Sequence, residues 1–272
     1  MARWIRFEHA GRQGFGELKA GPPGAGDTVA VHDGDLFGDH TPTGETLALD
    51  DLRLRLPCTP SKFIGLWNND HPQAAKQGLA IPATPLWFLK PPSSHHPHGE
   101  PILPPAGYAG RVVYEGELGL VIGQRCHRLT PEQASAAIFG VTCVNDVTAI
   151  DTISADASFA QWARAKGADT FGVFGPVIAT GLDISTLRVV TRVNGRERQN
   201  FACADMIFSP AQIVSALSQD MTLCPGDLIA CGTSLGVLPM KPGTTVEIDI
   251  EGVGRLCNTF GTVQSAPSSP ET

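Results

Sequence analysis

Apolar and polar positions alternate in short segments over the first part of the chain. Residues 5–7, 14–18 and 28–31 have the residue types and spacing of short β-strands. The stretches between them are rich in glycine, proline and aspartate, which favour turns. We therefore predict a small β-rich N-terminal domain over residues 1–57.

The rest of the chain also favours strands, with a few helices between them. The apolar runs that match strands are residues 62–67, 86–90, 140–144, 187–193, 228–231 and 245–250. Helical patterns cover residues 73–77, 130–139 and 210–217, and the last two begin after good N-caps, Thr130 and Ser209. This pattern predicts a mainly β domain with some helices over residues 58–264.

Two local signals complete the predicted organisation. The dipeptide Asn194-Gly195 lies between two apolar alternations and predicts a β-hairpin turn. Residues 265–272 are polar and proline-rich, so we expect a disordered tail there.

Composition narrows the class of protein. The 272 residues are 42% hydrophobic and 17% charged, which supports a sizeable core and argues against disorder. The net charge is -7 and no cluster of Lys and Arg stands out, so nucleic acid is not an expected partner. No segment reaches the ~20 apolar residues needed to span a membrane. The N-terminus is charged, unlike a signal peptide, and the seven cysteines form no C-x-x-C pair. We expect a soluble cytoplasmic protein with no membrane partner.

Glu115 and Glu117 head an apolar run that ends at Gly123. In a strand, residues i and i+2 project from the same face, so these carboxylates would lie side by side. Two adjacent carboxylates in an apolar setting are costly unless a cation lies between them, and hard divalent cations prefer oxygen ligands. The alternative is an edge strand whose polar face is simply hydrated.

Asp146 is a candidate third ligand. It ends a strand-like segment ~30 residues after the glutamates, and the predicted helix lies between them, so neighbouring strand ends can meet. Three carboxylates suit an octahedral cation better than zinc, which prefers histidine and cysteine. Asp146 could equally cap a turn after Asn145.

Several motifs, in one order, resemble the fumarylacetoacetate hydrolase family. The similar motifs, which lie within residues 58–262, are YEGELGLVIG at 114–123, VNDVT at 144–148, RAKGADTFGVFGP at 164–176, DMIFSP at 205–210, PGD at 225–227, GT at 232–233 and EGVG at 251–254. Each motif alone is weak, and together they are specific.

The resemblance implies a fold and a chemistry. The fold would be the mixed β-sandwich roll of that family, commonly a dimer, preceded here by the small N-terminal domain. The cofactor would be Mg²⁺ or Mn²⁺, with Ca²⁺ a further candidate, held by Glu115, Glu117 and Asp146. The substrate would be a small 2-keto acid whose enolate the cation stabilises.

The same resemblance assigns three further residues. Lys166 would add a positive charge near the oxyanion or the substrate carboxylate, although most lysines lie at the surface. Thr233 matches a threonine that helps to hold the substrate, but Ser234 follows where the family more often has proline. Lys90, at the end of residues 86–90, is a further residue expected to line the site.

The region around His71 departs from the family pattern. His71 matches the lid histidine that acts on the hydrolytic water, but Ala74 occupies the position of its glutamate partner. Trp67 and Asn68 also replace the usual Asn-Tyr pair. A histidine without an orienting carboxylate can still act as a base, and its alternative role is that of a surface or capping residue.

Other departures concern the far end of the substrate. Ile150 stands where many relatives have an arginine that binds a distal carboxylate, and Cys203 stands where threonine is frequent. These changes indicate a different acyl end. The histidines at 95, 96 and 98 lie in a proline-rich loop, and we interpret them as a solvated loop rather than as a metal site.

The leading hypothesis is a metal-dependent hydrolase that cleaves a C–C bond in an acylpyruvate-like 2-keto acid. The first rival is a decarboxylase or isomerase of 2-keto or hydroxydienoate diacids, of the kind used in aromatic catabolism, because neither reaction needs a strongly activated water. The second rival is a metal-binding homologue without catalytic activity.

Overall fold

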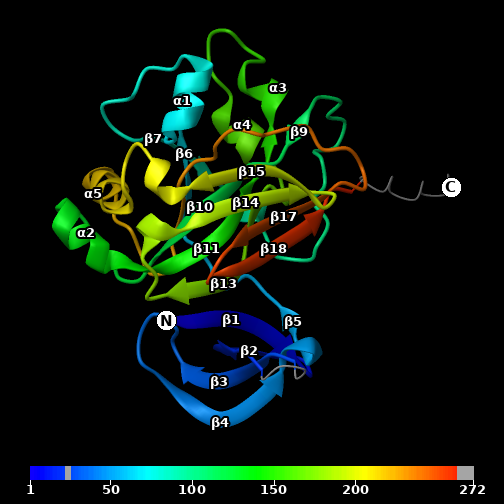
Figure 1. Cartoon of the computed structure of the whole chain (residues 1–272), viewed down its shortest axis with the longest axis vertical. Coiled ribbons are helices and arrows are strands. Elements are labelled where there is room, and N and C mark those ends of the chain that lie inside the picture. Colours follow the sequence, from blue (N-terminus) through cyan, green and yellow to red (C-terminus); the bar gives the residue numbers. More distant parts are fainter. Residues whose placement is uncertain (22–25, 262–272) are drawn as a thin grey trace, which may run out of the picture.

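One long sheet passes through the whole molecule (Figure 1). The computed structural model describes residues 1–21 and 26–261. The path of the sheet is β4-β3-β2-β1-β13-β11-β10-β16-β6-β7, with β5 beside β1 and β8 beside β13. The N-terminal strands therefore extend the sheet that carries the rest of the chain.

The N-terminal strands account for one end of this sheet. They are β1 (Ala2–His9), β2 (Arg12–Lys19), β3 (Thr28–Gly34), β4 (His40–Ala48) and β5 (Arg53–Leu54). The first three were predicted from the apolar alternation, whereas β4 was missed. Nearly all of its residues are exposed, and it contains a proline and a glycine, so it carries no apolar face that a pattern could reveal.

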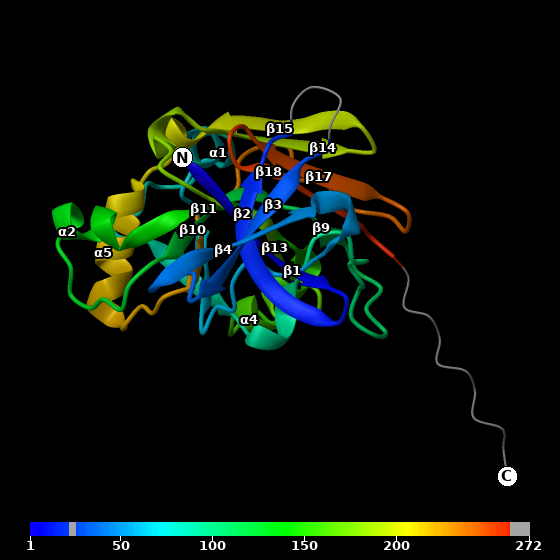
Figure 2. The ribbon, with the colours of Figure 1, turned by 90° about the horizontal axis from the view of Figure 1, so that it is seen from below.

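The junction between the two parts is a pair of hydrogen-bonded strands. β1 pairs antiparallel with β13 (Gly172–Thr180), from Ala2 opposite Thr180 to Ile5 opposite Val177. Figure 2 shows the N-terminal strands from below. Because β13 has β1 on one side and β11 on the other, it is an interior strand of the sheet.

The remaining strands of the long sheet frame the site. They are β6 (Phe63–Trp67), β7 (Leu86–Lys90), β8 (His95–His96), β10 (Gly116–Ile122), β11 (Ile138–Asp146) and β16 (Leu228–Ala230). Every residue of β10 is buried, which is the pattern of a strand covered on both faces.

A second sheet of four strands packs against this one. Its order is β15 (Arg196–Ala202), β14 (Arg188–Val193), β17 (Thr245–Ile250) and β18 (Gly254–Thr259). One apolar core joins the two sheets, with Leu118 and Leu120 of β10 in the same cluster as Val189, Ile248 and Leu256. The predicted Asn194-Gly195 turn joins β14 and β15 and is confirmed. A short pair of β9 (Val112–Val113) and β12 (Thr148–Ala149) completes the strands.

The helices lie at the edges of the sheets. They are α1 (His71–Gln77), α2 (Pro131–Ala137), α3 (Ile150–Ile153), α4 (Trp162–Lys166) and α5 (Pro210–Asp220), with 3₁₀ turns η1 (Leu49–Asp51), η2 (Pro92–Ser94), η3 (Ile184–Thr186) and η4 (Cys203–Asp205). In Figures 1 and 2, α2 and α5 lie side by side at one flank. Figure 1 shows α1, α3 and α4 together at another edge.

Sequence signals placed the starts of these helices better than their ends. Thr130 and Ser209 form capping boxes with glutamines three residues later, as helix N-caps commonly do. The helix predicted over residues 130–139 ends at Ala137, because Ile138 already pairs with Ile122 in the sheet. The helix predicted to end at residue 217 continues to Asp220.

The architecture confirms the predicted fold class: mainly β with a few helices, and a β-rich N-terminal region before the larger part. The predicted tail over residues 265–272 lies outside the described residues. Within the described ranges, no helix is both long enough and apolar enough to cross a membrane.

Candidate metal and substrate site

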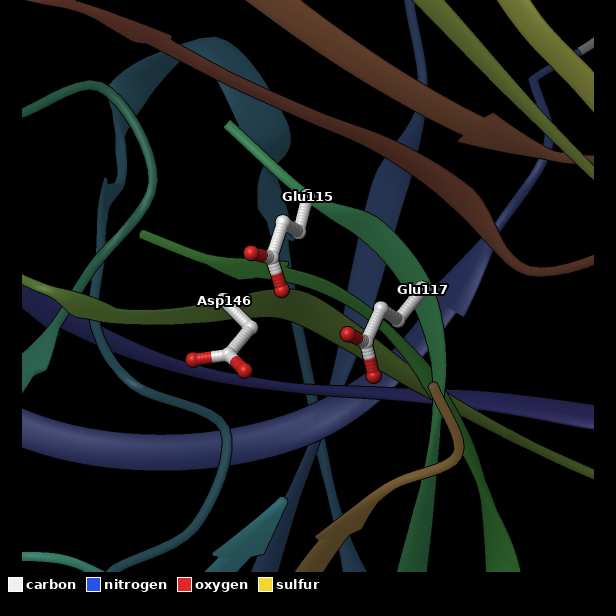
Figure 3. Close-up of side chains that lie close together, drawn as sticks. All are labelled: Glu115, Glu117 and Asp146. Atoms are coloured by element: carbon white, nitrogen blue, oxygen red, sulfur yellow. The ribbon is translucent and has the colours of Figure 1, made fainter. Parts of the chain in front are cut away.

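Three carboxylates meet where β10 begins and β11 ends. β10 and β11 are antiparallel neighbours, with Gly116 opposite Asn145. Glu115 and Glu117 therefore flank the start of β10 beside Asp146, and the Asp146 amide donates a hydrogen bond of 2.9 Å to the Glu115 carbonyl. One oxygen from each carboxylate lies within 4.8 Å of the others (Figure 3). The antiparallel pairing thus brings together the residues that the sequence motifs named.

Most of the carboxylate oxygens in this trio have protein partners. The Thr148 hydroxyl donates to Glu115 Oε1 at 2.9 Å, and the Gly232 amide donates to Glu117 Oε2 at 2.7 Å. Glu117 is only 1% exposed, yet its Oε1 has no hydrogen-bond partner among the described residues. A buried carboxylate oxygen without a partner is costly. Glu117 thus has one buried oxygen available for a ligand.

Two buried lysines neutralise part of the negative charge. Lys166, at the end of α4, donates from Nζ to Glu115 Oε2 at 2.7 Å and to Asp146 Oδ2 at 2.6 Å. Lys90, at the end of β7, donates to Asp146 Oδ1 at 2.5 Å. Both lysines are 2% exposed or less, which such charged side chains rarely are unless paired. When all three carboxylates are ionised, the two ammonium groups leave one negative charge in excess.

The pKa values of these groups reflect burial and charge together. Burial, and then the charges of Asp146 and Glu115, raise the pKa of Glu117 well above 4.5. Burial also raises the pKa of Asp146, but the two lysines outweigh it and hold that pKa below 3.8. The pKa of Lys166 is raised because its carboxylate partners outweigh the burial of its ammonium group. Lys166 is therefore a stable cation, and Glu117 is the group that a further cation would stabilise most.

This arrangement fits a hard divalent cation. The donors are carboxylate oxygens on a rigid strand pair, one of them buried without a partner. A dication would turn the single negative charge in excess into a single positive one. A ligand with one negative charge would neutralise it.

Thr233 lies at the same place through a different set of contacts. Its hydroxyl donates to the Gly116 carbonyl at 2.9 Å and accepts from the Gln199 side chain at 2.8 Å. Gln199 Oε1 in turn accepts from the Gly116 amide at 3.0 Å. These contacts fix the backbone between the two glutamates, so Thr233 and Gln199 position Glu115 and Glu117.

A cavity of about 190 Å³ opens beside the carboxylates. This volume is below the usual range for drug-sized ligands, so the cavity suits a small molecule. Its lining comes from β6, β7, α1, α3, α4, the residue after β6, the residue before β10 and the loop after β16. The lining residues are Leu66, Trp67, Asn68, Gln73, Gln77, Phe88, Glu115, Ile150, Ile153, Trp162, Lys166, Thr233 and Val237. Glu115 and Lys166 connect this cavity to the carboxylate trio.

The helix α1 presents amide side chains, not His71, to the cavity. Gln73 and Gln77 are four residues apart and share one helix face, and both line the cavity. His71 lies two residues from Gln73, on the opposite side of the helix, and is exposed. Ala74, at the position of the expected glutamate, is fully buried.

Asp70 and Asn69 fix the start of α1 to the loop that carries Thr233. Asp70 caps α1 by accepting from the Gln73 amide at 2.8 Å, and it also accepts from the Ser234 hydroxyl at 2.8 Å. Asn69 donates to the Cys231 carbonyl at 2.8 Å and accepts from the Phe208 amide at 2.8 Å. Ser234, which replaces the proline common in the resembling family, thus has a partner in this chain.

The other positions singled out from the sequence are distributed over different parts of the structure. Ile150 lines the cavity, whereas Cys203 is buried in a 3₁₀ turn. The prediction of a solvated loop for His95, His96 and His98 was wrong, because all three are half-buried. His95 packs near Phe63 and Phe174, and burial lowers its pKa to about 4.

Several cavity residues were not found from the sequence. They are Gln73, Gln77, Trp162, Ile153 and Val237. The i, i+4 spacing of the two glutamines on a predicted helix was the available signal. Nothing in the local sequence of Trp162 or Val237 indicated that these distant segments meet.

Comparisons with known proteins give the family. A family model described as fumarylacetoacetate (FAA) hydrolase C-terminal matches residues 62–261. A second model, described as Rv2993c-like, N-terminal, matches residues 2–57. Together the two models span nearly all of the described chain.

Three similar proteins have informative names. Oxaloacetate tautomerase YisK of Bacillus subtilis is 36% identical, over 79% of this chain and 75% of its own length. The 2,4-didehydro-3-deoxy-L-rhamnonate hydrolase of a Sphingomonas species is 35% identical, over 70% of this chain and 69% of its own. The solved structure of 2-hydroxyhepta-2,4-diene-1,7-dioate isomerase from Mycobacterium marinum matches with a TM-score of 0.87 and 37% identity, over 97% of this chain and 100% of that one.

Proposed function

The chain belongs to the fumarylacetoacetate hydrolase family, and on this premise we propose that it is a divalent-metal-dependent hydrolase that cleaves a C–C bond in an acylpyruvate-like 2-keto acid. The observation that carries the proposal is the buried trio of Glu115, Glu117 and Asp146, with an unpartnered Glu117 oxygen, beside a small cavity. We propose Mg²⁺ or Mn²⁺ as the cation.

The chemistry of the proposed reaction follows from the charges at this site. When bound, the cation would supply Lewis-acid stabilisation of the negative charge that develops on the keto oxygen of the substrate. Lys166 holds a fixed ammonium group 2.6–2.7 Å from two of the carboxylates and lines the cavity, so it can donate a hydrogen bond to the same oxygen. Lys90 keeps Asp146 ionised from the buried side. Thr233 and Gln199 hold the strand that carries the glutamates.

Hydrolysis, rather than a reaction of a diacid, is supported by the walls of the cavity. Ile150, Ile153 and Val237 are apolar, and the cavity provides no cation for a second carboxylate apart from Lys166, which is already paired. The similarity to the Sphingomonas protein, which is named a hydrolase of 2,4-didehydro-3-deoxy-L-rhamnonate, also supports hydrolysis.

An isomerase or decarboxylase is the second candidate, and the face of α1 favours it. Gln73 and Gln77 can hold a water molecule by hydrogen bonds, but an amide cannot take a proton from it. His71, the predicted base, is exposed on the opposite side of α1. Reactions that form an enolate without an activated water need only the metal side of the site.

Product analysis separates the two candidates. Acetylpyruvate, oxaloacetate and a hydroxymuconate-type dienoate are each incubated with the protein after EDTA treatment and then with added Mg²⁺ or Mn²⁺, and the products are followed by NMR. Pyruvate and acetate from acetylpyruvate support the hydrolase. Loss of CO₂ or a double-bond shift without cleavage supports the second candidate. Metal binding without any turnover would favour a homologue that has lost its activity.

We further propose a homodimer in the cytoplasm. β7 is an edge strand of the long sheet, and its Leu86, Trp87 and Leu89 are 38–43% exposed, which suits contact with a second copy. The seven cysteines are free thiols, as expected in a reducing compartment. Light scattering during size exclusion tests the dimer, and a monomer at micromolar concentration would contradict it.

A further inference from the structure

The cavity changes character with distance from the carboxylates. At its inner end it contains Glu115 and Lys166, and the rest of the lining is uncharged. Lys166 is the one cation among the lining residues, and its ammonium group is already bound to Glu115 and Asp146. A second substrate carboxylate in this cavity would therefore lack a free cationic partner, which is unfavourable.

Aromatic rings form one wall of the cavity. Phe88 and Trp162 stack with their ring centres 5.5 Å apart and an interplanar angle of 14°. Trp67 lies next to Trp162, with 5.9 Å between their ring centres. Ile150 and Ile153 add aliphatic surface. Such walls favour the neutral carbon skeleton of a ligand.

Asn68 supplies a polar group whose orientation is defined. Its Nδ2 donates to the Ala80 carbonyl at 2.9 Å, which fixes the orientation of the amide. Its Oδ1 is buried, has no partner among the described residues and belongs to a residue that lines the cavity. A carbonyl oxygen accepts a hydrogen bond from a hydroxyl group but repels a carboxylate. Contact with Asn68 Oδ1 would therefore favour a hydroxylated end of a ligand over an acidic one.

The charge balance at the carboxylate trio also favours a substrate with one carboxylate over a substrate with two. Three carboxylates, two lysines and a divalent cation leave one positive charge, which one substrate carboxylate neutralises. A second carboxylate would leave a buried excess of negative charge.

We propose that the substrate of this site is a small 2-keto acid with a single carboxylate, whose far end is uncharged and carries a hydroxyl group that donates to Asn68 Oδ1. This inference rests on the proposed function, because it takes the 2-keto acid end to be bound at the carboxylate trio. It excludes dioates and oxaloacetate as the best ligands.

Inert oxamates test the inference without any turnover. N-Propyloxamate, N-(2-hydroxypropyl)oxamate and N-(2-carboxyethyl)oxamate share the 2-keto acid end and differ in the tail. Their binding to the Mg²⁺-loaded protein is followed by tryptophan fluorescence, since Trp67 and Trp162 line the cavity. We expect the carboxyethyl probe to bind about tenfold more weakly than the propyl probe, or worse. We expect the hydroxypropyl probe to bind about threefold to tenfold more tightly than the propyl probe. Equal or tighter binding of the carboxyethyl probe, or no gain from the hydroxyl, overturns the inference.

Two variants assign the effects to residues. Ile150→Arg places a cation in the wall and is expected to raise the affinity for the carboxyethyl probe relative to the propyl probe by about tenfold. Asn68→Gly tolerates the positive φ of 56° at this position and is expected to abolish the preference for the hydroxyl. Ala136→Arg, at an exposed position on α2 outside the cavity lining, is the control and should leave both ratios unchanged. Ratios measured within one variant cancel any general loss of affinity.

Oxalate separates failure of this inference from failure of the proposed function. Oxalate could bind in a Mg²⁺-dependent manner while the carboxyethyl probe binds best, or while the three oxamates bind equally well. Either result leaves the proposed function standing and overturns the inference. If neither oxalate nor any oxamate binds in the presence of Mg²⁺, the proposed function fails, and the inference fails with it.

Discussion

Glu117 is the residue at which burial and charge conflict most strongly. It is almost completely buried, it lies beside two other carboxylates, and one of its oxygens has no partner among the described residues. The Gly232 amide satisfies only the other oxygen. A cation at this place would remove the conflict, which is why the metal site is the best-supported part of the proposed function.

Glu117→Gln should therefore weaken binding of Mg²⁺ or Mn²⁺ by about 100-fold or more, because it removes a charged ligand. It should also raise the thermal midpoint of the metal-free protein at neutral pH, since a neutral amide replaces a buried carboxylate. Calorimetric titration and thermal unfolding measure the two effects. Glu132→Gln, at an exposed position on α2, is the control and should change neither. Unchanged metal affinity in Glu117→Gln would exclude Glu117 as a ligand.

The raised pKa of Glu117 also predicts how stability depends on pH. The folded, metal-free protein retains a proton on Glu117 at pH values where the unfolded chain has released it. Metal-free stability should therefore fall as the pH rises from 4.5 through the raised pKa. Asp146, with its lowered pKa, acts in the opposite direction, but only below 3.8.

Metal binding should show the complementary dependence. The cation must displace the proton from Glu117, so affinity should increase as the pH rises from 4.5 through the raised pKa of Glu117, and binding should release protons. Titrations in buffers of different ionisation enthalpy count these protons. An affinity that is constant over this range would show that Glu117 is already ionised without the metal.

Site residues could be predicted from the sequence when neighbouring residues or a short motif indicated their role. Glu115 and Glu117 share a strand face two residues apart, and Asp146 follows in a motif, so the sequence alone indicated a trio. Gln199 and Asn68 have no such signal. Their roles depend on which distant backbone groups they contact, such as Gly116 and Ala80, and only the folded chain sets these contacts.

At the scale of elements, α1 is a seven-residue helix that is capped by Asp70 at its start and by Gly78 at its end. A helix this short is not stable by itself. Asp70 caps it and also binds Ser234, so one carboxylate joins α1 to the loop that carries Thr233. The position of Gln73 and Gln77 over the cavity therefore depends on Asp70.

Asp70→Ala should destabilise α1 locally by about 1 kcal/mol through loss of its N-cap. Hydrogen exchange of the amides of α1 measures this as faster local opening, while exchange in β10 and β11 stays the same. Asp183→Ala removes the cap of the exposed 3₁₀ turn η3 and serves as the control. Uniformly faster exchange over the whole chain would contradict a local role for Asp70.

The boundaries of helices and strands were predicted from the sequence only where local contacts determine them. The capping boxes at Thr130 and Ser209 are local chemistry, and both helices begin after them. The end of α2 is set instead by the pairing of Ile138 with Ile122 across the sheet. β4 was missed because an almost fully exposed strand depends on hydrogen bonds to β3 and not on an apolar face.

At the scale of the molecule, the N-terminal strands are part of the same sheet as the site. β1 completes the pairing of β13, and β13 in turn flanks β11, which carries Asp146. Ile5 of β1 is 1% exposed and packs in one cluster with Val177 of β13. The two parts of the chain should therefore unfold together.

Ile5→Ala should lower the free energy of unfolding by about 2–5 kcal/mol, as expected for a truncated core side chain. It should do so in a single transition seen both by far-ultraviolet circular dichroism and by tryptophan fluorescence. Lys19→Ala, at an exposed position on β2, is the control with little expected effect. A separate early transition of the N-terminal strands would contradict their cooperation with the larger part.

The central claim is that the carboxylate trio, with its cation, stabilises the enolate of a 2-keto acid. Exchange of the C3 protons of pyruvate in D₂O, followed by proton NMR, measures formation of that enolate directly and does not depend on which bond the enzyme breaks in its substrate. We predict exchange that stops with EDTA, returns with Mg²⁺ or Mn²⁺, and is lost in Glu117→Gln but not in Glu132→Gln. No exchange above the uncatalysed rate with either metal, or exchange that persists in EDTA or in Glu117→Gln, would contradict the claim.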